Sequence, residues 1–343
     1  MDRRCYQPYY GMWIEPVGQG KVMVSTCCNN VFLKANRLMI RDHFKESWNA
    51  LLFRRQREYI SKNDWRFCDG AHCSPTPRQI QERVFKDPRV GQSIAHGRTY
   101  LDYPPQEIFI FPSFSCNNDC FCCYCKQKMR CGTRNEYALT AEQSEEIKRD
   151  LFPGARSIVI SGGEPFYSIE GKNMIDAALA VAPEARVDVF TNGTLLHTYG
   201  LDRVIAASLG LRISFYGMSE RVYKDVTGTD GFMKMMGNVD YLLRQGYSNM
   251  RFLYLLSKRS DKDVRKFCSF VSKHKGIEGV VRNNISEGGR YRHLMLSLAE
   301  EFASDLPRLS FEYRSETAFY KMFRKVISPW FSFRYASRND LQT

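Results

Sequence analysis

The chain has 343 residues, with 50 Lys and Arg against 37 Asp and Glu, and 43% of its residues are hydrophobic. This length and composition fit one large globular domain or two unequal ones, and exclude collagen-like, low-complexity and wholly disordered chains. No apolar run is long enough for a membrane-spanning helix, and the start MDRRCYQPYYG lacks the apolar region of a secretory signal. We therefore expect a cytoplasmic protein, whose 12 cysteines have a purpose other than disulfide bonding.

Residues 1–73 show little regular patterning. Proline and glycine mark turns near the start, and one helical pattern, residues 46–59, lies between cysteines. This segment is too small and irregular to build a large core alone, so a bound metal would supply the missing stability. The proline-rich residues 74–106 are predicted to form a linker with room for one short helix.

From residue 107 the chain alternates between strand and helix patterns. Six short apolar runs predict strands at 107–114, 157–160, 187–190, 211–216, 251–256 and 279–285. Helical patterns lie between them, and the capping-box sequence that begins at Thr140 opens a helix that continues to residue 150. Regular alternation implies right-handed crossovers and a parallel sheet. The predicted fold class is α/β, with an open, partial (β/α)6 TIM-like barrel at residues 107–306.

The positive charge is concentrated at the two ends. Residues 1–73 hold 12 basic and seven acidic residues, and residues 307–343 hold seven basic and three acidic ones. The tail at 307–343 also carries aromatic residues, and we expect it to form an extension that covers the open edge of the barrel or binds a partner. The charge favours an anionic partner or substrate, although solubility alone would explain it equally well.

Five cysteines lie within residues 116–125, and one triple among them, Cys116, Cys120 and Cys123, has the spacing C-x3-C-x2-C. Three thiolates on one loop can bind three irons of a [4Fe–4S] cluster and leave the fourth iron open. Zinc is the alternative, but it more often takes paired C-x2-C arms with a fourth ligand. The spacing therefore predicts a cluster site that is open for chemistry.

This motif, placed after a first barrel strand, resembles that of the radical S-adenosylmethionine superfamily, and the resemblance continues along the barrel. The matching segments are a GGEP sequence after the second strand, a TNG turn after the third, a serine on the fourth and a G-R turn after the sixth. The resemblance implies that these positions bind S-adenosylmethionine: Gly162, Gly163, Glu164, Pro165, Thr191, Asn192, Ser214 and Arg290.

The resemblance also implies the chemistry. A [4Fe–4S] cluster would reduce S-adenosylmethionine to a 5′-deoxyadenosyl radical, which abstracts hydrogen from an unactivated C–H bond. We expect a sugar, nucleotide-sugar or other small anionic substrate, and an electron donor of the flavodoxin or ferredoxin type. The alternatives are a maturase of a ribosomally synthesised peptide and a non-catalytic, metal-stapled module that binds nucleic acid. Nearby, Cys122, Cys125 and Cys131 could donate hydrogen, bind metal or simply pack.

The amino-terminal cysteines resemble the ligands of a SPASM-type auxiliary cluster domain. Ser47-Trp48-Asn49 and Arg54-Arg55 are similar to its helix, although such domains usually follow the barrel and this one precedes it. The resemblance implies a second [4Fe–4S] cluster in residues 1–73, with zinc as the alternative. Its ligands would be Cys5, Cys27 (or Cys28), Cys68 and Cys73.

Overall fold

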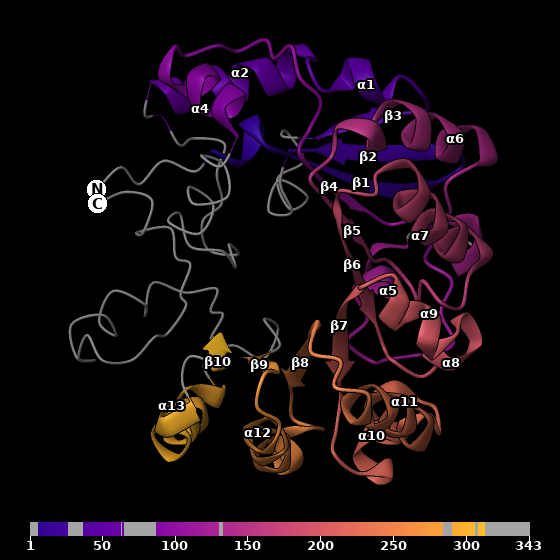
Figure 1. Cartoon of the computed structure of the whole chain (residues 1–343), viewed down its shortest axis with the longest axis vertical. Helices are drawn as coiled ribbons and strands as arrows, with labels where there is room; N and C mark the ends of the chain where they lie inside the picture. The colour runs from indigo at the N-terminus through magenta and orange to yellow at the C-terminus, as the bar shows by residue number, and fades with distance from the viewer. Residues whose placement is uncertain are drawn as a thin grey trace. The chain divides into compact units, whose positions relative to one another are not determined.

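The computed structural model describes residues 6–26, 37–62, 64, 87–129, 133–283, 290–305 and 308–312. The chain divides into two compact units. Figure 1 labels helices and strands of both. The first contains the described residues up to Ser115 and those from Lys128 to Asp188. The second contains Cys116–Gln127 and the described residues from Val189 onward. Strands alternate with helices and pair mostly in parallel, which confirms the predicted α/β class.

The sheet of the first unit has the strand order β5-β4-β1-β2-β3. Its strands β4 and β5 are parallel neighbours, and β1 pairs in parallel with the other side of β4, where Trp13 lies opposite Phe109. Strands β1, β2 and β3 form an antiparallel meander. The strand bounds are β1 Gly11–Gly18, β2 Lys21–Ser25, β3 Leu38–Ile40, β4 Glu107–Ile110 and β5 Ser157–Ile160.

The pairing of β1 with β4 is a feature that the sequence analysis does not predict. It makes residues 11–25 an extension of the sheet that contains the first predicted barrel strand. Gln19 and Gly20, both with positive φ, form the two-residue turn between β1 and β2, a backbone that suits tight antiparallel hairpins. The described part of residues 1–73 therefore shares a sheet with the barrel strands, and the predicted boundary at residue 73 stays a prediction.

Helices of the first unit pack beside this sheet. The predicted capping box is confirmed, because the Thr140 hydroxyl accepts a hydrogen bond from the Gln143 amide while the Gln143 side chain accepts one from the Thr140 amide. The predicted helix at 46–59 is instead two helices, broken at Trp48–Ala50. The bounds are α1 Phe44–Ser47, α2 Leu51–Ser61, α4 Pro88–Ala95, α6 Ala141–Asp150 and α7 Ile169–Val181.

Arg57 on α2 organises the packing of this region. Its fully buried guanidinium lies 4.3 Å from the centre of the Trp48 ring. The guanidinium donates to the carbonyls of Pro8, Trp48 and Thr99, at 2.8, 2.7 and 2.9 Å. Burial lowers the pKa of Arg57 to about 9. One side chain thus joins three separated segments, each through backbone oxygens.

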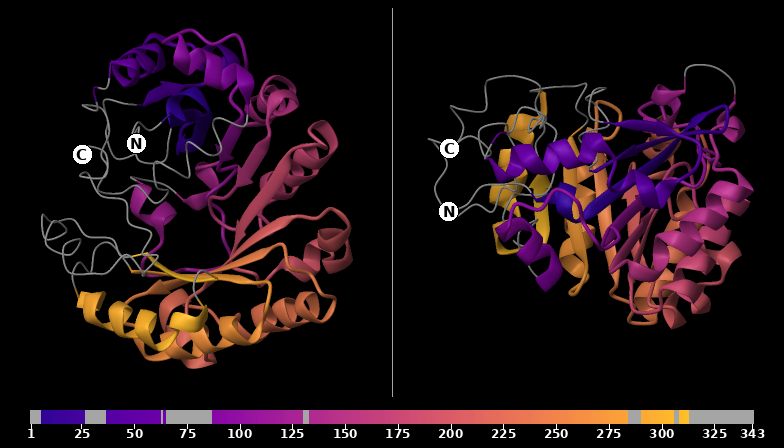
Figure 2. Two further views of the ribbon diagram at one scale, coloured as in Figure 1. Left: turned by 60° about the vertical axis from the view of Figure 1, so that its left-hand side comes forward. Right: turned by 90° about the horizontal axis from the view of Figure 1, so that it is seen from above.

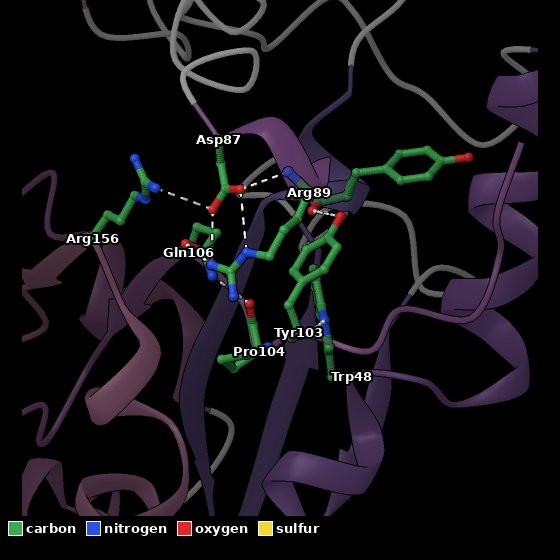
Figure 3. Close-up of polar contacts among 8 residues, drawn as sticks. Trp48, Asp87, Arg89, Tyr103, Pro104, Gln106 and Arg156 are labelled. Carbon is green, nitrogen blue, oxygen red and sulfur yellow. Dashed lines mark hydrogen bonds and ion pairs between the residues drawn. The ribbon is translucent and has the colours of Figure 1, made fainter. Parts of the chain in front are cut away.

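A second polar cluster holds the residues that enter α4 (Figure 3). Asp87 is buried, caps α4 by accepting from the Arg89 amide, and pairs with the guanidinium groups of Arg89 at 2.9 Å and Arg156 at 3.4 Å. Burial alone would raise the pKa of Asp87, but the hydrogen bonds from Arg89 and the two positive charges outweigh it, so the pKa lies below its ordinary value. The cluster links the start of α4 to the residue before β5.

The second unit has the parallel strand order β7-β8-β9-β10. Its helices α12 and α13 lie along one face of these strands (Figure 2). On that face Phe215, Phe252 and Phe267 pack in a buried aromatic cluster. The strand bounds are β7 Gly210–Phe215, β8 Met250–Leu256, β9 Glu278–Asn283 and β10 Leu309–Glu312; β6, Arg186–Thr191, is divided between the units after Asp188.

All six predicted strands are confirmed, as β4 to β9, and β10 adds a parallel strand from the predicted tail. Further helices follow the strands of this unit. Their bounds are α5 Tyr124–Lys128, α8 Leu196–Tyr199, α9 Leu201–Ala206, α10 Glu220–Thr227, α11 Phe232–Arg244, α12 Val264–Lys273 and α13 Arg292–Glu301. No described helix is long and apolar enough to cross a membrane.

Candidate cluster and cofactor site

The predicted cluster cysteines lie on the loop between β4 and α5. Cys120 is buried, Cys116 and Cys123 are half-buried, and all three are thiols rather than disulfides. The Asn118 amide lies 3.4 Å from the Cys116 sulfur, and the Lys126 amide lies 3.4 Å from the Cys123 sulfur. Amide hydrogen bonds of this kind stabilise negative charge on sulfur and tune iron–sulfur clusters. The donor set therefore fits a cluster held by three thiolates.

Within the described residues, no three His, Cys, Asp or Glu side chains are gathered in the way that a single metal ion requires. A four-iron cluster makes a different demand, because each cysteine binds a different iron and the sulfurs stand apart around the cluster.

Backbone bonds fix the second half of this loop to α10. The Asp119 amide donates to the Thr227 carbonyl at 2.8 Å, and the Phe121 amide donates to the Val226 carbonyl at 3.1 Å. The guanidinium of Arg259 lies 4.3 Å from the centre of the Phe121 ring. The segment that leads into and past Cys120 is therefore held against a helix of the same unit.

The GGEP segment follows β5 in the first unit. Gly162 has a φ of 114°, and a Cβ atom there would lie 2.5 Å from the Ser113 carbonyl; one on Gly163 would lie 2.1 Å from the Ser115 carbonyl. The amides of Gly163 and Glu164 donate to those two carbonyls, each at 2.8 Å. Only glycines fit this close approach. The turn is thereby joined to Ser115, the residue that precedes Cys116 in the chain.

Glu164 is buried, and its carboxylate accepts a hydrogen bond from the Phe166 amide at 3.2 Å. A buried carboxylate is costly unless donors surround it, so its position in a turn after a parallel strand is typical of a binding site.

The TNG turn after β6 is also tightly built. The Thr191 hydroxyl accepts from the Gly193 amide at 3.0 Å, and Asn238 on α11 donates to the Gly193 carbonyl at 2.8 Å. Gly193 has a φ of 76°, and a Cβ atom there would lie 3.0 Å from both Ile213 and Met235. Both Thr191 and Asn192 are buried. The turn is thus held from two sides.

Ser214 on β7 is half-buried, and two residues farther along the same face lies Tyr216, which sequence reasoning missed. Burial raises the pKa of Tyr216 well above its ordinary value, and the neighbouring Cys120, Cys122 and Cys116 raise it further. The alternation of strand side chains was the available signal, because it places residue 216 on the face of residue 214.

The other predicted residues divide into two groups. In the described part, Arg290 is exposed, Cys122 is half-buried and Cys125 is buried. Cys268 lies buried on α12, and burial raises its pKa to about 12. The proposed auxiliary ligands and one surplus cysteine lie outside the described residues: Cys5, Cys27, Cys28, Cys68, Cys73 and Cys131.

Comparison with known sequences identifies one domain of the chain. Residues 110–271 match the family model of the Radical SAM superfamily. This region contains the cysteine loop, the GGEP turn and the TNG turn. The chain therefore carries a radical SAM superfamily domain at residues 110–271.

Curated relatives match about half of the chain. A protein named "Probable GTP 3′,8-cyclase" from Metallosphaera sedula is 24% identical over 183 residues, which cover 51% of this chain and 54% of that protein. A protein of the same name from Sulfurisphaera tokodaii is 24% identical over 165 residues, covering 46% and 49%. The chain thus spans about half the length of these relatives.

Solved structures support the fold. SuiB from Streptococcus suis bound to the precursor peptide SuiA has a TM-score of 0.52 at 14% identity, covering 97% of this chain and 77% of that one. The same protein bound to S-adenosylmethionine has a TM-score of 0.51 at 15% identity, covering 92% and 75%. At this identity the likeness concerns the fold alone.

Proposed function

We propose that this protein is a radical SAM enzyme that holds a [4Fe–4S] cluster at Cys116, Cys120 and Cys123, binds S-adenosylmethionine beside it and abstracts hydrogen from an unactivated C–H bond of its substrate. The observation that supports this most directly is the loop of three thiols with amide hydrogen bonds to two of the sulfurs, inside a region that matches the Radical SAM superfamily. When bound, the cluster and S-adenosylmethionine supply a 5′-deoxyadenosyl radical.

In this proposal the chain's own residues bind and orient the cofactor. The glycines of the GGEP turn allow it to pack directly against the backbone of Ser113 and Ser115, and Glu164 offers a buried carboxylate to a cationic group such as an amine. Ser214 offers a hydroxyl on β7, two residues before Tyr216. By resemblance, the full proposed set is Gly162, Gly163, Glu164, Pro165, Thr191, Asn192, Ser214 and Arg290.

For the substrate we propose a sugar, a nucleotide-sugar or another small anionic molecule. The net charge of +13 favours an anion, and the curated relatives are named for a reaction of GTP, a phosphorylated nucleotide. A peptide is the second candidate, because a protein of the same fold is bound to a precursor peptide.

Three further proposals rest on the sequence alone. They are an auxiliary [4Fe–4S] cluster held by Cys5, Cys27 or Cys28, Cys68 and Cys73, an electron donor of the flavodoxin or ferredoxin type, and a cytoplasmic location. For the chain as a whole we propose a partial six-unit barrel preceded by a SPASM-like amino-terminal domain.

Iron analysis after anaerobic reconstitution tests this proposal. Two clusters predict about eight irons per chain, and a Cys116→Ala, Cys120→Ala, Cys123→Ala triple variant should keep about four. Zinc without iron in the wild-type protein, together with salt-dependent RNA binding, would instead favour the non-catalytic module.

A further inference from the structure

The cysteine loop and the TNG turn are joined by a closed ring of three side chains. The side-chain Nδ2 of Asn192 donates to the side-chain Oδ1 of Asn117 at 2.9 Å, and Nδ2 of Asn117 donates in turn to the Thr194 hydroxyl at 2.9 Å. The Thr194 hydroxyl closes the ring by donating to the side-chain Oδ1 of Asn192 at 2.6 Å. All three residues belong to the second unit. We call this ring the asparagine clamp.

The clamp is supported from the side of the turn. The backbone amide of Thr194 donates a further hydrogen bond to the side-chain Oδ1 of Asn192 at 2.9 Å, and Thr194 is buried. Asn192 thus bonds inside the protein through both its oxygen and its nitrogen. Because Asn238 also holds the Gly193 carbonyl, the turn is a rigid base to which the loop is attached.

The residue after Asn117 is fixed in a similar way to a different element. Asn118 is buried, donates to the Tyr223 hydroxyl at 3.2 Å and accepts from the Thr229 hydroxyl at 2.9 Å. Two consecutive side chains between Cys116 and Cys120 therefore reach the β6 turn and the α10 region respectively. A loop held at two such points fixes the orientation of the Cys116 and Cys120 side chains, which flank these two asparagines.

We infer that Asn117, Asn192 and Thr194 are positioning residues, whose clamp sets the direction in which Cys116 and Cys120 present their sulfurs to the cluster. The inference rests on the proposed function, because it concerns how the loop carries that cluster. It gives Asn192 a role in which its amide orients the cysteine loop. A misplacement of about 1 Å at a reactive centre can cost a hundredfold in rate, so a loosened loop should act on the chemistry more than on the fold.

The test compares Asn117→Ala with Asn249→Ala in the full-length, anaerobically reconstituted protein. The first removes the loop's side of the clamp and leaves the bonds between Asn192 and Thr194. The second is the same chemical change at an exposed residue of the loop before β8, whose side-chain amide donates to the Ser208 carbonyl at 2.8 Å. The measurements are iron content, the electron paramagnetic resonance spectrum of the reduced cluster with and without S-adenosylmethionine, and hydrogen–deuterium exchange over residues 117–121.

We expect Asn117→Ala to keep the iron content, shift the spectrum, speed exchange of residues 117–121 and slow 5′-deoxyadenosine formation by about tenfold or more. Asn249→Ala should match the wild-type protein in every measurement. A spectrum and exchange rates for Asn117→Ala that equal those of the wild-type protein would overturn the inference.

Thr194 gives a second, independent comparison. Thr194→Val keeps the shape and deletes the hydroxyl, whereas Thr194→Ser keeps the hydroxyl and deletes a methyl group that lies near Gly231. The clamp predicts that the valine variant is altered in spectrum and exchange and that the serine variant is not. The opposite order would show that packing, and not the hydrogen bonds, holds the loop. If the wild-type protein binds no four-iron cluster, the proposed function fails, while the exchange measurements still test the clamp.

Discussion

Two polar networks hold the two units of this chain in different ways. In the first unit, buried Arg57 donates to three backbone carbonyls, which belong to segments packed around Trp48. In the second unit, Asn117, Asn192 and Thr194 bond to one another through side chains and join a cysteine loop to a turn. The first network should therefore govern stability, and the second the geometry of the site.

The largest expected effect is on stability, from Arg57→Met. This change leaves the buried carbonyls of Pro8 and Trp48 and the half-buried carbonyl of Thr99 without their donor. Since each buried acceptor left unsatisfied costs about 1–3 kcal/mol, the free energy of unfolding should fall by about 3–5 kcal/mol. Chemical denaturation measures this, with Arg54→Met on the exposed side of the same helix as the control. An Arg57→Met loss no greater than that of the control would contradict the role given to Arg57.

Asp87→Asn should cost less, about 1–3 kcal/mol, because it weakens the pairs with two half-exposed arginines and keeps the shape of the side chain. Since the folded pKa of Asp87 lies below its ordinary value, its contribution is present above about pH 4 and is lost as the pH falls through the folded pKa. The wild-type protein should therefore lose part of its stability on acidification, and the variant should lose less. An equal loss of stability in the two proteins as the pH falls would refute this.

The clamp predicts a smaller change in stability together with a larger change at the site. Thr194→Val deletes one buried hydroxyl and should lower the free energy of unfolding by about 1–2 kcal/mol. If the two networks differ as we argue, Arg57→Met leaves the electron paramagnetic resonance spectrum of the reduced cluster unchanged in the protein that remains folded. Thr194→Val should alter that spectrum. Equal spectral changes in both variants would remove the distinction between the networks.

The smallest expected effect comes from the ion pair between Lys126 on α5 and Asp119 on the cysteine loop, in which both side chains are exposed. Exposed pairs contribute about 0–1 kcal/mol, so Lys126→Gln should change neither stability nor iron content measurably. A loss of iron in this variant would show that the loop depends on a surface charge as well as on the clamp.

Much of the fold was predictable from the sequence because its signals are local. The runs that form β4 to β9 are short and apolar and end in turn residues, and the capping box marks the start of α6. β1 was missed because Gly11, Pro16 and Gly18 resemble turn residues, while its partner β4 begins at residue 107. β10 was missed because it has four residues and follows a proline.

The site was predictable in composition but not in its connections. Cysteine spacing identifies Cys116, Cys120 and Cys123, since ligands on one loop are close in sequence. The partners of Asn117 and Asn118 lie 75 or more residues away, and such hydrogen bonds exist only after the chain has folded. α10, which holds the loop, is a short helix rich in β-branched and aromatic residues with weak helical propensity.

The most direct test of the central claim is the release of 5′-deoxyadenosine from S-adenosylmethionine by the reconstituted wild-type protein under dithionite. We predict release by the wild-type protein and none by the Cys116→Ala, Cys120→Ala, Cys123→Ala triple variant. A wild-type protein that contains its iron and never releases 5′-deoxyadenosine would contradict the proposed enzymatic function.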